Sequence, residues 1–129
     1  MKNLLIATAV LEAATGLAPL LSPSLPVSLL LATSLETPAA LTIARLAGAA
    51  LLSLSTVCWS ARDEKPGRTL TVLVVAMLFY NAAAVALLVA YADNGLKSSG
   101  AGLWPAVLLH TALAIWCTHL PRVGAATIG

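Results

Sequence analysis

Charged side chains are scarce in this chain and make up 9% of its 129 residues, whereas hydrophobic residues make up 60%. The mean hydropathy of +0.95 is far above that of an ordinary soluble domain, so the composition argues against that class. The formal net charge is only +2, and the basic residues stand in short connectors. No basic patch therefore indicates nucleic-acid binding.

Cysteine is also rare, and the two that occur, Cys58 and Cys117, form no Cys-x-x-Cys motif, so nothing supports a thiol-redox enzyme. We expect both to pack as small buried hydrophobes. His119 is two positions from Cys117 and points to another side of a helix, so the two cannot easily hold one metal. Phosphate-binding glycine loops and nucleophile elbows are absent as well. The sequence thus predicts no metal site, no cofactor and no assigned catalytic residue.

Four long apolar segments fill most of the chain, at residues 4–21, 38–60, 69–91 and 101–120. A helix needs about 20 mostly apolar residues to cross a bilayer, and each segment approaches or exceeds that length. Barrel strands alternate polar and apolar residues over about ten positions, so these continuous runs predict helices. The sequence therefore predicts an all-α polytopic membrane protein, a four-transmembrane-helix bundle that forms one domain over residues 1–129.

The connector 22–37 is rich in Leu and Val, yet it is too short to span a membrane. It predicts an interfacial helix or a partly re-entrant lid, and a connector that simply rests on the bundle is the alternative. At its end, Thr37 followed by Pro38 is typical of an N-cap with proline at the first helical position.

The basic residues indicate an orientation, because cytoplasmic loops are enriched in Lys and Arg. One side of the predicted bundle receives only Lys97, whereas the other receives Lys2, Arg62, Lys65, Arg68 and Arg122. Both termini are therefore expected in the cytoplasm, in a cell membrane of the bacterial inner-membrane type.

Each apolar segment also carries one strongly polar residue, and these are Glu12, Arg45, Asn81 and His110. At 1.5 Å per residue, the predicted spans place all four at depths between about 11 and 15 Å from the outer side. Ionisable residues inside a bilayer usually face a bundle interior and mark functional sites. We expect the four to meet in a polar pocket in the outer half of the bundle, where Tyr80 could add a hydroxyl.

Two interpretations of these residues remain open. In one, Glu12 and Arg45 form a structural ion pair, because an unpaired buried charge is costly and pairing is the usual remedy. In the other, the cluster binds a ligand or a proton, with Arg45 anchoring an acidic or carbonyl group while Glu12 and His110 exchange a proton. Misplaced span boundaries, or a lipid-facing residue that snorkels to the interface, would separate the residues.

One partial resemblance bears on the first segment. A glutamate midway along the first helix, in Val10-Leu11-Glu12 with Gly16 following, is similar to that of the small multidrug-resistance transporters. The resemblance implies a four-helix protein whose glutamate exchanges protons for cationic drugs. It covers about seven residues, and the long first connector and Arg45 depart from it, so no family is assigned.

The sequence leads to a small membrane protein that binds a lipophilic molecule or serves as an accessory subunit of a larger membrane complex. The alternative is a proton-coupled transporter of a small solute that acts as a homodimer. A third hypothesis is a membrane enzyme that handles a quinone or haem, with His110 as the candidate iron ligand. The lipid bilayer is the expected surrounding, and a homo-oligomer is compatible with all three.

Overall fold

The structure is a computed structural model that describes residues 1–93 and 100–120. Within those residues all regular secondary structure is helical, and no strand occurs. The helices are α1 (Lys2–Leu21), α2 (Ser24–Leu31), α3 (Pro38–Ala61), α4 (Arg68–Asp93) and α5 (Leu103–His119). Lys97 and Arg122, which contributed to the predicted orientation, lie outside the described residues.

Three of these helices, α1, α3 and α4, are long and apolar enough to cross a membrane, which indicates membrane localisation. Their ends agree with the predicted segments to within two residues. Helix α5 is also apolar but has 17 residues, or about 26 Å of helix, against a hydrocarbon core of about 30 Å. The all-helical fold is therefore confirmed, and the count of four spans stays a prediction.

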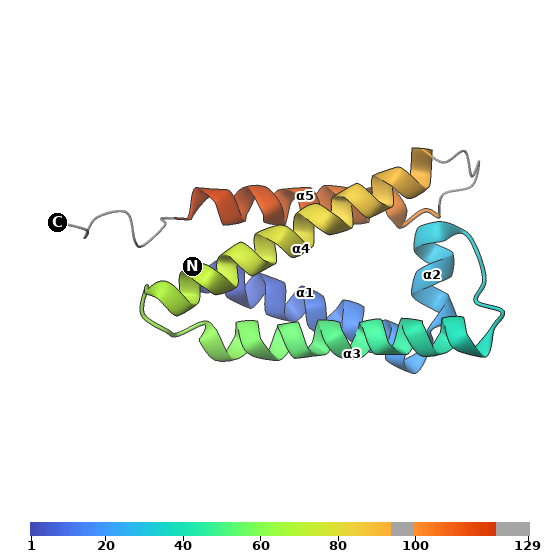
Figure 1. Ribbon diagram of the computed structural model, residues 1–129, viewed down its shortest axis with the longest axis horizontal. Helices are drawn as coiled ribbons and strands as arrows, with labels where there is room; N and C mark the ends of the chain where they lie inside the picture. The colour runs from blue at the N-terminus through green and yellow to red at the C-terminus, as the bar shows by residue number, and fades with distance from the viewer. Residues whose placement is uncertain (94–99, 121–129) are drawn as a thin grey trace.

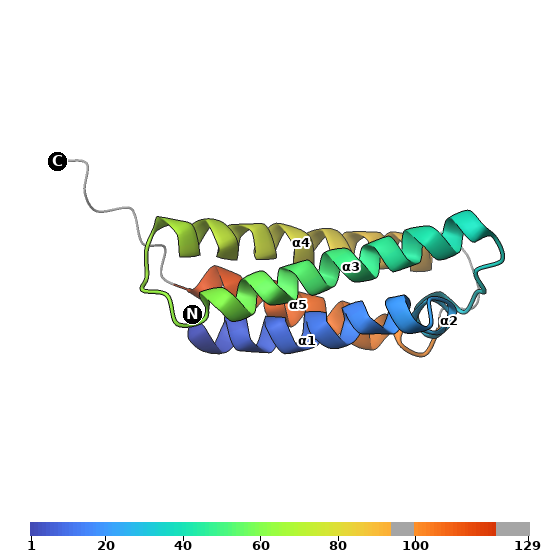
Figure 2. The same ribbon diagram turned by 90° about the horizontal axis from the view of Figure 1, so that it is seen from below.

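The four long helices form two antiparallel pairs (Figures 1 and 2). Helix α1 packs along α3, helix α4 packs along α5, and contacts between the pairs are much sparser. The α1–α3 pair is the tighter one because Gly16 and Gly48 bring the two backbones together. A Cβ atom at Gly48 would lie 2.6 Å from the carbonyl oxygen of Gly16. Close backbone approach through small residues is how membrane helices gain packing energy.

An apolar core joins the two pairs at the end of the bundle that holds the connector 62–67, called here the connector end. Its buried side chains come from all four long helices and are Leu4, Leu5, Ala9, Cys58, Leu70, Val74, Met77, Leu113 and Cys117. The two cysteines are thus buried within an apolar core, as the sequence predicted. At the rim of this end, the Lys2 ammonium lies 2.6 Å from the Asp63 carboxylate and lowers the pKa of that carboxyl.

Helix α2 lies across the opposite end of the bundle, the α2 end, and reaches from α1 toward the start of α5 (Figure 1). Backbone N–H groups of Gly100 and Gly102 donate to the carbonyls of Leu30 and Leu29, at 3.1 and 2.8 Å. The Tyr91 hydroxyl donates to the Leu31 carbonyl at 2.8 Å. The connector 22–37 therefore contains the expected helix, which ties the two pairs together, and its position relative to a lipid surface stays a prediction.

The start of α3 follows the local signal in the sequence. The Thr37 side chain accepts a hydrogen bond from the backbone N–H of Ala40 at 3.1 Å, and Pro38 is the first helical residue. A cap of this type satisfies one of the N–H groups that the first helical turn leaves without an intrahelical partner.

Candidate functional site

Asn81 of α4 and His110 of α5 form the best-defined part of the polar cluster. Asn81 is fully buried, and its side-chain amide donates to the Met77 carbonyl of its own helix at 2.8 Å. The Asn81 carbonyl oxygen lies 2.8 Å from Nδ1 of His110. Because that oxygen can only accept, Nδ1 of His110 is the donor, and the other ring nitrogen is left for another partner.

Tyr80 connects this pair of residues to helix α1. Its ring meets the His110 ring edge to face, with centroids 5.7 Å apart and planes inclined by 81°. Edge-to-face contacts of this kind fix the orientation of both rings. The Tyr80 hydroxyl also lies near enough to the Glu12 carboxyl group to interact with it electrostatically. Polar side chains of α1, α4 and α5 thus lie in one region of the bundle.

Glu12 is the most unusual member of the cluster, because it is an acidic residue with only 2% of its surface exposed. The Thr15 hydroxyl lies 3.4 Å from one of its carboxyl oxygens. One turn before Glu12, the buried Thr8 hydroxyl has no hydrogen-bond partner within the described part of the chain. A buried hydroxyl without a partner costs free energy, so this spot favours a polar guest such as a water molecule.

Arg45 does not join the cluster, and the predicted ion pair with Glu12 is absent. Arg45 lies on the exposed side of α3, and no acidic side chain of the described residues pairs with it. Glu12 precedes Gly16 by four residues, Arg45 precedes Gly48 by three, and the helices are antiparallel. The glycine contact therefore separates the two residues by about 10 Å along the axis. Helical side chains also lean toward their own N-terminus, so these two lean apart.

This separation makes a quantitative prediction for the Glu12→Ala and Arg45→Leu variants. Their changes in the free energy of unfolding are expected to add to within about 0.5 kcal/mol in the double variant, because the side chains share no partner. Thermal unfolding of the wild type, the two single variants and the double variant in one detergent measures this sum. A coupling of about 2 kcal/mol would mean that the carboxylate and the guanidinium meet after all.

Of the predicted site residues, the structure brings together Glu12, Tyr80, Asn81 and His110 and leaves Arg45 outside. Asn81 and His110 are in direct contact. The similar depth expected for Glu12 and Arg45 is wrong, because the Gly16–Gly48 contact separates the two residues along the helix axes. Thr15 escaped the sequence analysis, although its spacing of three residues from Glu12 places both on neighbouring sides of α1. That these residues bind a ligand or a proton stays a prediction.

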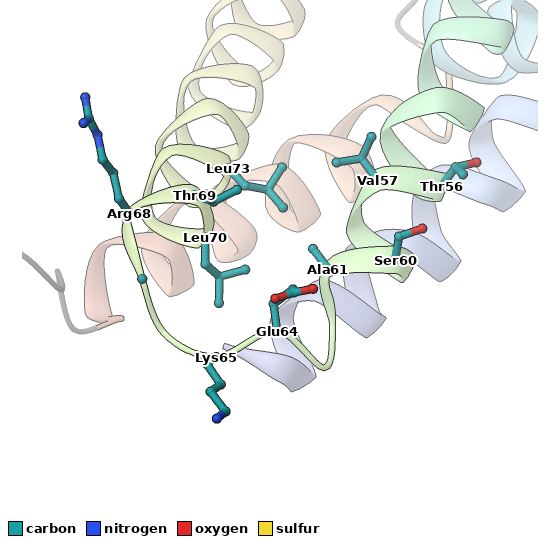
Figure 3. Close-up of a pocket in the computed structure, with 11 residues that line it drawn as sticks. Thr56, Val57, Ser60, Ala61, Glu64, Lys65, Arg68, Thr69, Leu70 and Leu73 are labelled. Carbon is teal, nitrogen blue, oxygen red and sulfur yellow. The ribbon is translucent and has the colours of Figure 1, made fainter.

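A cavity of about 580 Å³ lies at the connector end, away from the polar cluster (Figure 3). It opens between the last turns of α3 and the first turns of α4, where Val57 and Leu73 point toward each other. The Glu64 carboxylate turns toward Ala61, while Lys65 and Arg68 extend away. None of the four cluster residues lines this cavity.

Comparison with known proteins adds no assignment, since no family model, no curated protein and no solved structure matches this chain.

Proposed function

We propose that the protein is a small multi-pass membrane protein that binds a lipophilic cation at Glu12 in exchange for a proton. The proposal places it in the cell (inner) membrane with four spans and both termini in the cytoplasm. The observation that carries it is a buried carboxyl group without a basic partner among the described residues. A carboxylate in a dry interior must be matched by a proton or by a cation.

The surroundings of Glu12 suit such an exchange. The Thr15 hydroxyl donates to the Leu11 carbonyl at 2.8 Å, so its oxygen, 3.4 Å from the Glu12 carboxyl group, can accept a hydrogen bond from the protonated acid. The Tyr80 ring provides an aromatic surface near the carboxyl group. Aromatic faces attract organic cations, more strongly when water is excluded. The Thr8 hydroxyl supplies a further acceptor on the same side of α1. A guest at this point would lie between the two helix pairs, where interhelical contacts are sparse.

The absence of Arg45 from the cluster also supports the proposal. A guanidinium group beside Glu12 would neutralise it and leave no affinity for a second cation. With Arg45 on the exposed side of α3, the carboxyl group has no cationic partner among the described residues. Arg45 was one of two features that distinguish this chain from the small multidrug-resistance transporters. Because Arg45 does not contact Glu12, this difference does not affect the carboxyl group.

The test uses the purified full-length protein in detergent and tetraphenylphosphonium as the probe cation. We expect the wild type to release about one proton for each cation bound, since one carboxyl group changes partner. Glu12→Gln keeps the size and hydrogen bonding of the side chain but cannot ionise, so proton release should vanish and affinity should fall about tenfold or more. Calorimetry measures the affinity, and a pH indicator measures the protons.

Glu36→Gln is the matched control, because Glu36 is an exposed carboxylate near the start of α3. It should bind the cation and release protons as the wild type does. Equal proton release by wild type and Glu12→Gln would reject Glu12 as the exchanging group. A wild-type protein that binds no cation at all would reject the proposal as a whole.

The second candidate function is proton-coupled transport by a homodimer, and the exposed small residues Ala82 and Ala86 of α4 favour it. Small side chains on an exposed helix face let a second copy pack closely. In liposomes, a pH gradient should then drive accumulation of the same cation, and Glu12→Gln should abolish it. An accessory subunit would instead bind the cation without gradient-driven flux.

A further inference from the structure

All four sulfur-containing residues of the described chain gather at the connector end. The sequence holds two Cys and two Met in total. Cys58 of α3, Met77 of α4 and Cys117 of α5 are buried members of one apolar core, and Met1 packs against the same core. These residues are far apart in sequence, so only the packing of three helices brings them together. The sequence predicts no metal site because no local spacing relates these residues.

The distances suit a shared metal ion. The Cys58 Sγ and Met77 Sδ atoms are 3.8 Å apart. With metal–sulfur bonds of about 2.3 Å, two sulfurs on one trigonal or tetrahedral metal lie about 3.8 to 4.0 Å apart. Cys117 is a buried member of the same core, on the helix that packs along α4. The sulfurs of Cys58 and Met77 therefore already have the separation that a common ion requires.

We propose that Cys58, Met77 and Cys117 form a binding site for one Cu(I) ion. Thiolate and thioether ligands are soft, and that combination selects Cu(I) over zinc, which prefers thiolate, imidazole or carboxylate ligands. Binding converts the two thiols to thiolates and releases two protons, so the ion and its ligands carry one negative charge. The connector end bears Lys2, Arg62 and Lys65, whose positive charges offset it.

The structure also places a small cavity beside one of the three proposed ligands. The cavity, of about 20 Å³, lies beside Cys117 and is bordered by Met1, Val74 and Leu120. It lies at the connector end rather than in the middle of the bundle. The site is separate from the Glu12 cluster and does not depend on the function proposed above.

The test loads purified full-length protein with Cu(I) under reducing conditions and competes the metal with bathocuproine disulfonate. We expect one Cu(I) per chain, and a copper X-ray absorption spectrum with sulfur neighbours only, at about 2.3 Å. Cys58→Ala and Cys117→Ala should each lower the affinity by about tenfold or more, and Met77→Leu, which keeps the volume, by about tenfold.

Leu113→Ala is the matched control, because Leu113 belongs to the same core but carries no sulfur and does not line the cavity beside Cys117. It loosens the packing and should leave copper affinity unchanged, so loss of binding in the sulfur variants cannot be ascribed to general loosening. Nitrogen or oxygen neighbours in the wild-type spectrum would overturn the proposal. So would equal copper binding by the wild type and the Cys58→Ala/Cys117→Ala double variant.

Discussion

Gly48→Val is expected to destabilise the protein by about 3 kcal/mol, because it adds a side chain where α1 and α3 are in backbone contact. A Cβ atom at Gly48 would lie 2.6 Å from the Gly16 carbonyl oxygen and 2.9 Å from the Pro19 ring. Neither the backbone of α1 nor a proline ring can rotate out of the way, so the helices must separate. The cost then includes the contacts that the whole α1–α3 pair loses.

Thermal unfolding in a mild detergent, followed by circular dichroism, measures this effect. Ala47→Val is the matched control, because Ala47 is the preceding residue of α3 and is exposed. It adds the same β-branched side chain to a helix and should cost only about 0.5 kcal/mol. Similar losses in the two variants would mean that the α1–α3 contact is looser than the structure shows.

Asn81→Leu is expected to cost about 2 kcal/mol, because it removes the acceptor of His110 and leaves the Nδ1 donor buried without a partner. Leucine has the same branched shape as asparagine and is larger, so the loss does not come from a cavity. The change should also reduce the proton release that accompanies cation binding, since the His110 ring loses the group that orients it against Tyr80.

The double variant Asn81→Leu/His110→Leu tests the cause of that loss. Replacing both partners of a buried hydrogen bond by apolar groups can be nearly neutral, so the double variant should recover most of the stability. Thermal unfolding of the single and double variants provides the comparison. A double variant less stable than either single variant would show that Asn81 and His110 stabilise the bundle separately.

The helices themselves could be predicted because each depends on local sequence. Apolar runs of sufficient length have to be helical where backbone groups cannot reach water, and Thr37-Pro38 marks a helix start by local hydrogen bonding. The meeting of Asn81 with His110 could be anticipated as well. Both lie near the middle of adjacent antiparallel helices, so an estimate of depth from residue counts is sufficient.

The failure at Arg45 has a different cause. Residue counts from uncertain span ends placed Glu12 and Arg45 at similar depths, but the relative position of α1 and α3 is set by the Gly16–Gly48 contact. A shift of one helical turn moves a residue by about 5 Å along the axis and by itself decides whether two side chains can meet. The sequence shows that both residues are small, but it does not predict that they contact each other.

The amino-acid sequence alone determined the class of this protein: a helical chain of long apolar segments, each with one polar residue that hydrocarbon does not tolerate in isolation. Those features follow from composition and periodicity, which act over a few turns of one helix. Only the tertiary structure decided which polar residues share a site and which sulfur atoms share a core. Contacts of that kind depend on how separate helices pack. A close approach such as that of Gly16 and Gly48 sets the relative position of two helices, and therefore which side chains can meet along their whole length.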